Sequence, residues 1–454
     1  MSTRRWTTIA IAAMTVLLAA GCQPWTQFMG NPGLNGNDAG ETFIGPSNVT
    51  SLQQAYTIAL PAGSRVVLSP VTSGGDVFAG TDKGQLVVAS NGTTNCSGSP
   101  KVCQPIWTAS FPDTDTASPP VVAAGMVYEA FSNSSTGFGA LAAYDVNGST
   151  NCSGTPKTCL PLWTAPATSV AGPNVDGGRV FVDDLQTQQL EVFDAAGVTG
   201  CSGAPTRTCL AEWTAPIHSF AVPSIANGRV YVPTFDTTPA YVAAYDEAGS
   251  TNCTGSPVAC APLFTVPLPE STTGSVDVSN GVGYVETETS WPTNSQLVAF
   301  DANGVTGCTG SPLVCQPEWT ALLSGAAHFS TPAVANGRVY AASTATWGVL
   351  DQFDAAGVTG CSGTPTVCTR LVTTPSTSST NSFASPIVTN GLVVEKGIVY
   401  PTATSGCSGG TPIVCSPLWT APVTPYISGS VISSATLLVA GNDSFIHAYQ
   451  LTAS

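Results

Sequence analysis

Fourteen of the fifteen cysteines fall into seven close pairs, and this spacing constrains the fold more than any other feature of the chain. Most pairs sit in the phrase Cys-Ser/Thr-Gly-x-Pro-x-x-Cys, where Gly and Pro favour a turn that brings the two thiols together. Zinc ligands sit closer together and recruit a second pair or histidines, so we predict local disulfides instead. The predicted pairs are Cys96/Cys103, Cys152/Cys159, Cys201/Cys209, Cys253/Cys260, Cys308/Cys315, Cys361/Cys368 and Cys407/Cys415.

The pairs recur at a period of about fifty residues. Their first cysteines are 56, 49, 52, 55, 53 and 46 residues apart, which is typical of a repeat architecture. Each unit contains four short β patterns. In one unit these patterns cover residues 221–225, 229–232, 241–245 and 263–266, with the hairpin signal Asn227-Gly228 between the first two. Four antiparallel strands repeated around an axis form a β-propeller.

The two ends of the chain complete each other. Residues 54–59 resemble a fourth strand without the three before it, and residues 429–432, 436–439 and 445–449 resemble three strands without a fourth. Pairing them would leave no open sheet edge. We therefore predict an all-β fold, an eight-bladed β-propeller of four-stranded antiparallel blades closed by the N-terminal strand, and we expect a monomer.

One aromatic residue recurs in the fourth strand of the units. A buried aromatic ring brings a large apolar area, and neighbouring blades must stack to cover their apolar faces. We expect each ring to lie over the neighbouring blade. The residues concerned are Tyr56, Trp107, Trp163, Trp213, Phe264, Trp319 and Trp419.

The first residues have the pattern of an export signal. Arg4 and Arg5 precede an apolar run over residues 9–20, which is too short to span a membrane, and Gly21-Cys22 follows. This ending resembles the bacterial lipoprotein signal, although its leucine lies four residues before the cysteine. The resemblance implies that Cys22 carries the lipid, and two acyl chains would anchor it stably. The alternative is an ordinary cleaved signal peptide with an incidental cysteine.

The predicted organisation is a lipoprotein signal peptide over 1–21, an anchor, tether and cap over 22–50, and a propeller over 51–454. We expect an extracytoplasmic, membrane-anchored lipoprotein. The formal charge of −15 excludes a protein that tracks nucleic-acid phosphates, because such binding needs a basic surface. With three histidines, the chain is also a poor candidate for a histidine-rich metal enzyme.

The repeated phrase resembles the quinoprotein-like (PQQ-like) β-propeller repeat family. The shared pattern is a strand, Asn-Gly, Arg-Val-Tyr-Val, a strand ending in Ala-Phe-Asp-Ala-x-Gly, and Trp-x-Ala; the disulfide loop is inserted before the last part. The resemblance implies either a quinone-dependent alcohol or sugar dehydrogenase or a non-enzymatic scaffold lipoprotein. The alcohol dehydrogenases hold their quinone through calcium, an aspartate base and a disulfide of adjacent cysteines. This chain has no adjacent cysteines, so we predict no cofactor and find no recognisable site for PQQ or calcium.

Acidic residues are the remaining candidates for chemistry. We interpret the aspartates that end third strands as turn residues, which bond nearby backbone N–H groups. Others would suit calcium, although we favour solvated loops for them. The turn aspartates are Asp145, Asp194, Asp246, Asp301 and Asp354, and the other acids are Asp113, Asp115, Asp183, Asp184, Glu286 and Glu288.

Two histidines, His218 and His328, precede first strands at equivalent positions, so we expect them to face the axial channel; His447 lies in the last strand. Arg179, Arg229 and Arg338 begin second strands and belong to the repeat.

The leading hypothesis is a non-catalytic, lipid-anchored propeller that binds a protein or acts as a scaffold. The alternatives are a PQQ-dependent oxidoreductase with a non-standard site and a module that binds cell-wall or extracellular glycan through Trp291 and Trp347.

Overall fold

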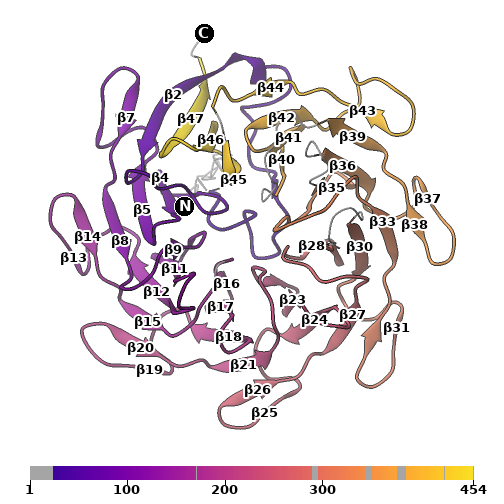
Figure 1. The fold of residues 1–454 in the computed structure, drawn as a ribbon, viewed down its shortest axis with the longest axis horizontal. Coiled ribbons are helices and arrows are strands. Elements are labelled where there is room, and N and C mark those ends of the chain that lie inside the picture. Colours follow the sequence, from indigo (N-terminus) through magenta and orange to yellow (C-terminus); the bar gives the residue numbers. More distant parts are fainter. Residues whose placement is uncertain are drawn as a thin grey trace, which may run out of the picture.

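The strands form eight small sheets arranged in a ring around a central axis, as Figure 1 shows. The structure, a computed structural model, describes residues 24–169, 171–288, 295–343, 349–375, 385–423 and 425–452. Across these ranges the helical content is a single 3-10 turn, η1 (Val49–Ser51), and no helix is long and apolar enough to span a bilayer. The fold is therefore an all-β propeller.

One blade illustrates the plan. Its inner strands β22 (Ser224–Ala226), β23 (Arg229–Pro233) and β24 (Tyr241–Asp246) pair antiparallel with each other, and the outer strand β27 (Phe264–Pro267) pairs antiparallel with β24. The turn between β22 and β23 is Asn227-Gly228, and both residues have the positive φ that a tight hairpin turn requires. The three inner strands are therefore consecutive in the chain, and the outer strand follows them.

The other blades repeat this order of three inner strands and one outer strand. They consist of β3 (Val71–Ser73), β4 (Asp76–Gly80), β5 (Gln85–Ser90) and β8 (Trp107–Ser110); β10 (Val121–Ala123), β11 (Met126–Ser132), β12 (Gly139–Asp145) and β15 (Trp163–Ala165), with β9 (Thr116–Ala117) against β11; β16 (Asn174–Asp176), β17 (Arg179–Asp184), β18 (Gln189–Asp194) and β21 (Trp213–Pro216); β28 (Asp277–Ser279), β29 (Val282–Glu286), β30 (Gln296–Asp301) and β33 (Trp319–Leu322); β34 (Ala333–Ala335), β35 (Arg338–Ser343), β36 (Val349–Asp354) and β39 (Val372–Pro375); β40 (Ile387–Thr389), β41 (Leu392–Glu395), β42 (Ile398–Pro401) and β44 (Trp419–Thr420); and β45 (Pro425–Ser433), β46 (Thr436–Gly441), β47 (Phe445–Leu451) and β2 (Leu52–Ala59).

Each cysteine motif folds into a small hairpin that adds to the sheet of the preceding blade. All seven predicted disulfides are present. The second strand of each hairpin pairs in parallel with the outer strand of the blade before it, so the sheets are mixed. The hairpin strands are β6 (Cys96–Ser97) with β7 (Lys101–Cys103), β13 (Cys152–Ser153) with β14 (Lys157–Cys159), β19 (Cys201–Ser202) with β20 (Arg207–Cys209), β25 (Cys253–Thr254) with β26 (Val258–Cys260), β31 (Cys308–Thr309) with β32 (Val314–Cys315), β37 (Cys361–Ser362) with β38 (Val367–Cys368), and the single strand β43 (Ile413–Val414).

The last hairpin departs from the other six in its strand pairing, although its predicted disulfide is present. The disulfide Cys407–Cys415 is formed, but Cys415 lies just beyond β43 and does not pair with Cys407 across a strand ladder. A single bridge between Ser408 and Val414 takes the place of that ladder.

The reason lies in where this loop carries an extra residue. Both this pair and Cys201/Cys209 are separated by 8 residues instead of 7. In Cys201/Cys209 the extra residue follows the proline, and the two cysteines still lie opposite each other. In the last loop the extra residue precedes Pro412, and only the single bridge between Ser408 and Val414 forms within the loop.

The predicted fold class, an eight-bladed β-propeller of four-stranded antiparallel blades, is therefore wrong in its number of blades and in its number of strands per blade. Seven blades follow a common plan, with about six strands each, because each gains strands from the hairpin of the next unit. The remaining sheet, β1-β40-β41-β42-β44, has no hairpin at its outer edge, and the parallel strand β1 (Asn37–Asp38) is added at its inner edge. The hairpins project from the perimeter of the ring (Figure 1).

The ring closes through the N-terminal strand. Strand β2 pairs antiparallel with the last strand, β47, from Leu52 opposite Leu451 to Ala59 opposite Phe445. The first hairpin strand, β7, then joins the other edge of β2. The closing sheet therefore combines residues from both ends of the chain with the first disulfide hairpin.

The recurrent aromatic residues lie at the boundaries between blades. Trp163, in the outer strand of one blade, packs on Gly197 in a turn of the next and donates its indole N–H to the Ala195 carbonyl at 3.2 Å. A Cβ on this glycine would overlap the indole, and its φ of +62° also favours glycine. The same pairing of ring and turn glycine occurs for Trp107/Gly148, Trp213/Gly249, Phe264/Gly304, Trp319/Gly357 and Tyr56/Gly92, whereas Trp419 packs edge-on against Tyr449.

Candidate functional site

The N-terminal segment over residues 25–38 occupies the axis of the ring. Figure 1 shows this indigo segment crossing the centre. Its backbone carbonyl groups accept hydrogen bonds of 2.7 to 3.0 Å from the first strand of six blades. These bonds join Thr72 to Trp25, Val122 to Thr26, Ile225 to Pro32, Val278 to Gly33, Val334 to Asn35 and Val388 to Gly36.

The two remaining blades are also tied to the N-terminal region. The side-chain amide of Asn174 in β16 donates to the Pro32 carbonyl at 2.8 Å. In the closing blade, the backbone N–H of Ala435 donates to the Glu41 carboxylate at 2.9 Å. The N-terminal region therefore contacts every blade. The sequence assigned residues 22–50 to an anchor, tether and cap and did not indicate that part of them fills the axis.

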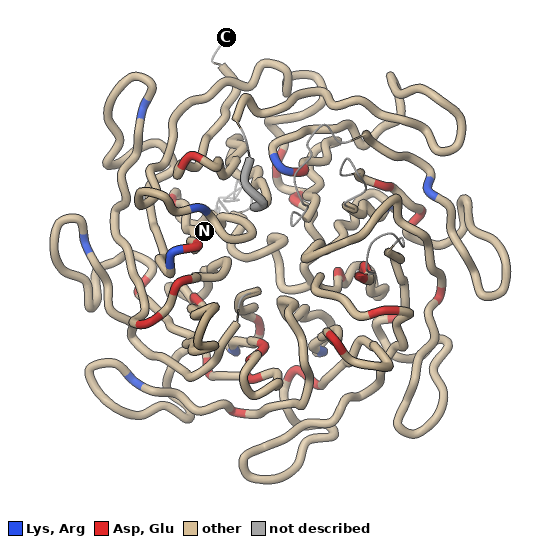
Figure 2. The backbone as a smooth tube through the Cα atoms, viewed as in Figure 1, with Lys and Arg blue, Asp and Glu red and all other residues tan. Residues whose placement is uncertain are grey.

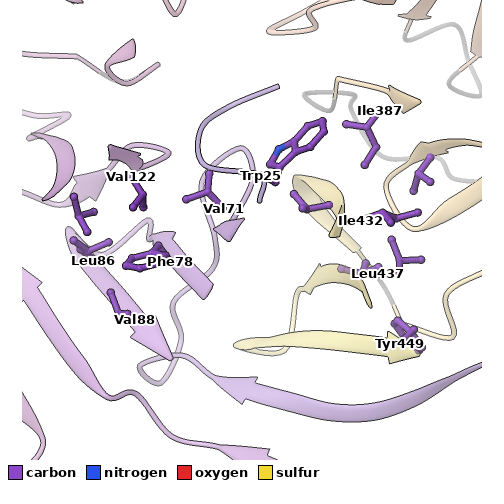
Figure 3. Packing of buried hydrophobic residues seen from close by; sticks show 14 of the residues in the cluster. Trp25, Val71, Phe78, Leu86, Val88, Val122, Ile387, Ile432, Leu437 and Tyr449 are labelled. Carbon is purple, nitrogen blue, oxygen red and sulfur yellow. The ribbon is translucent and has the colours of Figure 1, made fainter. Parts of the chain in front are cut away.

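Apolar side chains of the segment fill the space that surrounds it. Phe28, Met29 and Leu34 are buried and pack against Val222 and Ala333 of the inner strands. Trp25 lies between two neighbouring blades and the inner strand β40, as Figure 3 shows with Val71, Ile432 and Ile387. A void of about 10 Å³ remains beside Trp25, Phe28 and Met29. At this level the axis is packed like a protein core.

Small hydroxyl residues connect the blades near the axis. The backbone N–H of Val222 donates to Ser275 Oγ at 2.9 Å, that of Ser275 to Thr331 Oγ1 at 3.1 Å, and that of Thr331 to Ser385 Oγ at 2.9 Å. Each donor sits one blade before its acceptor. These hydroxyl groups are buried and engaged in inter-blade bonds, so their role is structural.

Several candidate acids lie inside the blades rather than in solvated loops. Asp183, Asp184 and Glu286 are buried, so the expectation of a solvated position was wrong for them. Burial raises the pKa of Asp183 to about 8, and the nearby Asp184 adds to this. Burial likewise raises the pKa of Glu286 to about 8, with smaller contributions from Glu395 and Asp351. These acids are at strand ends, where the amphipathic pattern does not reveal burial.

The other acids lie in turns and loops. Asp115 is half-buried and accepts hydrogen bonds from Ser134, which lower its pKa. The turn aspartates act as predicted by turn chemistry: Asp301 accepts the backbone N–H groups of Asn303, Val305 and Thr306. Burial would raise the pKa of Asp301, but these hydrogen bonds outweigh it and lower the pKa.

The three histidines have separate environments. His328 forms an ion pair with Glu288, which raises the pKa of the imidazole; Thr273 also donates to Glu288 at 2.7 Å. His218 packs against Phe220 and Phe235. His447 is buried between Asp443 and Gln54. Throughout the described ranges, no three His, Cys, Asp or Glu side chains are grouped so as to hold a metal ion.

The perimeter carries the exposed apolar residues. One repeated position lies just before a hairpin and is occupied by Val198, Val305 and Val358. A second position lies just after the second cysteine of a hairpin and is occupied by Leu160 and Leu210. The exposed fraction of Val305 is 75% and that of Leu210 is 70%. A groove of about 480 Å³ lies between the first two hairpins. Figure 2 shows single basic residues on some of these hairpins, whereas acidic residues are spread over the blades.

Three predicted positions cannot be placed in this architecture. Cys22, the predicted lipid attachment site, lies outside the described residues. So do Trp291 and Trp347, the residues predicted for glycan recognition.

Comparison with known proteins agrees on the fold alone. No family model and no curated protein sequence matches the chain. Among solved structures, BamB from Moraxella catarrhalis has a TM-score of 0.54 at 14% identity, covering 89% of this chain and 98% of its own. Quinohemoprotein alcohol dehydrogenase from Comamonas testosteroni has a TM-score of 0.60 at 11% identity, covering 95% and 81%. A europium-containing methanol dehydrogenase has a TM-score of 0.51 at 12% identity, covering 93% and 89%.

The described residues do not fit a quinone of the kind that the dehydrogenase resemblance implies. Phe28, Met29 and Leu34 occupy the axis, and the void beside Phe28 and Met29, of about 10 Å³, holds no more than a water molecule. Every cysteine that the structure describes is in a hairpin disulfide at the perimeter, so none can stack on a ring at the axis. The geometry therefore gives no reaction step that uses a quinone.

Proposed function

We propose that this chain is a non-catalytic, lipid-anchored extracytoplasmic propeller that binds a partner protein through its surface. The observation that carries the proposal is the packed axis, where the chain's own residues Trp25, Phe28, Met29 and Leu34 take the space at the centre of the ring. Because the axis is filled, we place the binding site for the partner protein on the surface of the propeller. The likeness to BamB and to the dehydrogenases does not choose between binding and catalysis, because it is a likeness of fold.

The perimeter supports a protein as the partner. Large apolar side chains such as Leu210 and Val305 are exposed there at positions that recur from blade to blade. The repetition of such residues along the perimeter gives a partner protein several similar apolar contact points. The disulfide beside each of them holds its hairpin in a fixed conformation, which lowers the entropic cost of binding.

The compartment follows from the disulfides, and the anchor from the signal sequence. Seven disulfides indicate an oxidising compartment outside the cytoplasm. The lipid anchor rests on the resemblance of the Gly21-Cys22 ending to a lipoprotein signal. A Cys22→Ala variant should move the protein from the membrane fraction to the soluble extracytoplasmic fraction, and retention in the membrane would contradict the anchor.

Titration with PQQ and Ca²⁺ tests the absence of catalysis. We expect the purified mature chain to retain no quinone absorbance after desalting and to reduce no dye with alcohols or sugars. A known quinoprotein dehydrogenase treated in parallel is the positive control. Retained absorbance together with dye reduction would replace the binding proposal with the oxidoreductase.

Photo-crosslinking in the native host tests the partner surface. A photoreactive phenylalanine analogue at Leu210 or Val305 should give one discrete adduct with a host protein. The same analogue at Lys83, an exposed residue in a turn between inner strands, should not. Equal adducts at all three positions, or none at any, would contradict a specific perimeter surface.

A further inference from the structure

A pocket of about 470 Å³, lined by both polar and apolar residues, opens between the β28–β30 and β34–β36 blades. This volume lies in the range of small-molecule sites. Asn35 and Asn37 of the axial segment, Asn280 and Asn336 of the two hairpin turns, and the apolar residues Val282 and Ala356 are among the residues that line it. The pocket therefore combines three parts of the chain that are far apart in the sequence.

The pocket lies where one blade has a valine in the position that is arginine in three others. Arg179, Arg229 and Arg338 begin the second strands of their blades, and Arg229 reaches across to donate to the Asn303 carbonyl of the next blade at 3.3 Å. In the β28–β30 blade the equivalent residue is Val282, and the residue that corresponds to Asn303 in the following blade is Ala356. Both side chains are too short to fill the gap, so it stays open.

The polar groups of the pocket are available to a ligand. Within the ranges that the structure describes, the side-chain amides of Asn37, Asn280 and Asn336 have no protein hydrogen-bond partner. Each amide offers two donors and one acceptor. Asn35 uses its carbonyl oxygen to accept from Asn31 and from the Asn37 backbone, which fixes its orientation at the floor of the pocket.

The chemistry of the walls selects the class of ligand. The lining contains no Asp, Glu, Lys, Arg or His, so a charged ligand would lose its hydration without gaining a counter-charge. A peptide strand cannot add to the inner strands here, because the N–H groups of Val278 and Val334 already donate to Gly33 and Asn35. Amides beside small apolar side chains suit a ring that has hydroxyl groups at its edge and C–H groups on its face.

We infer that this pocket binds a neutral saccharide of one or two rings. The inference is independent of the proposed protein partner, which would use the perimeter. It also does not depend on Trp291 or Trp347.

Saturation-transfer NMR on the purified mature chain tests the inference. The probes are cellobiose, maltose and diacetylchitobiose, with glucuronate as a charged sugar and N-acetyl-trialanine amide as a peptide. We expect transfer to at least one neutral disaccharide and none to glucuronate or the peptide. No transfer to any neutral disaccharide, or transfer to the peptide alone, would overturn the inference.

Two kinds of variant locate the binding. Val282→Arg places in the gap the residue that three other blades carry there, and we expect it to abolish the transfer. Asn280→Gly/Asn336→Gly removes two amides but keeps the turns, since both residues have φ of 52°, and it should weaken affinity about tenfold or more. Asn227→Gly, in the equivalent turn of another blade with φ of 53°, is the matched control and should bind as the wild type does.

The variants must also keep their fold for the comparison to hold. Thermal unfolding followed by circular dichroism should give the same midpoint for the wild type, Asn227→Gly and Asn280→Gly/Asn336→Gly. Saccharide transfer that survives both Val282→Arg and the double glycine variant would place the binding elsewhere and overturn the inference.

Discussion

The contact between an aromatic ring and a turn glycine is the repeated unit of blade-to-blade packing. Trp163 is 1% exposed and lies against Gly197, and the Ala195 carbonyl accepts both its indole N–H and the Tyr128 hydroxyl. The turn aspartate before each glycine holds the turn by accepting backbone N–H groups, as Asp194 does from Val198 and Thr199. One short sequence motif therefore supplies the carbonyl group that accepts the indole N–H, the turn, and the surface on which the aromatic ring packs.

Replacing Trp163 with alanine should destabilise the protein by about 3 to 5 kcal/mol, because a large buried side chain is lost and a cavity remains. Urea unfolding followed by circular dichroism measures the change. Leu160→Ala, three residues away and 62% exposed, is the control and should change stability by less than about 0.5 kcal/mol. A loss as small as that of the control would show that the ring does not join the blades.

The buried acids make the stability of the protein depend on pH. The pKa of Asp183 and of Glu286 is about 8 in the folded chain, because both are buried, and about 4 in an unfolded chain. The folded state therefore binds more protons than the unfolded state between about pH 4 and pH 8. Stability from these two groups is present below this range and is lost as the pH rises through it.

We expect Asp183→Asn and Glu286→Gln to reduce the loss of stability between about pH 5 and pH 8 by about 1 to 3 kcal/mol each. Urea unfolding at the two pH values gives the difference. Asp115→Asn is a useful control, because hydrogen bonds lower the pKa of this group and it stays ionised across the range. Parallel pH profiles for the wild type and both amide variants would contradict the burial of the charges.

The disulfide hairpin is the element that distinguishes these blades. Each hairpin comes from one repeat unit but pairs with the outer strand of the blade before it, as β20 does with β15. Arg207 of the hairpin donates its backbone N–H to the Leu162 carbonyl at 3.1 Å. The hairpin therefore connects neighbouring blades at the perimeter, while the Trp163 ring connects them further inside.

Removing one hairpin disulfide should show this connection. Cys201→Ala/Cys209→Ala should lower stability by about 2 to 3 kcal/mol, as expected for a short loop. Hydrogen exchange should become faster in residues 201–209 and in the adjoining strand Trp163–Ala165. Exchange that changes only within the hairpin would contradict its role between blades.

At the level of elements, local patterns predicted much of the fold. The strand positions, the disulfide pairs and the closure by β2 followed from alternation, turn residues and spacing. The parallel pairing of a hairpin with another blade depends on how neighbouring units pack, which no pattern within one unit contains. For the same reason the predicted four antiparallel strands per blade were too few. The irregular pairing at Cys415 was missed because cysteine spacing alone does not show on which side of the proline an extra residue falls.

At the scale of the whole molecule, the axial segment could not be predicted. Residues 25–38 are rich in Gly and Asn and have no periodicity, and they are held mainly through backbone carbonyl groups, which any residue supplies. The proposed saccharide pocket did leave a signal in the sequence, since Val282 stands where three other units have arginine. That signal has meaning only once the arginine is known to bridge two blades.

Hydrogen–deuterium exchange of the full mature chain tests whether the axis of the ring is packed. The amide groups of Val278, Val334 and Val388 should exchange as slowly as those inside the sheets, because they donate to Gly33, Asn35 and Gly36. Peptides that cover residues 276–279, 332–335 and 386–389 report on them. Fast exchange in all three peptides would mean that the inner strands face an open, water-filled channel, and the account would be contradicted.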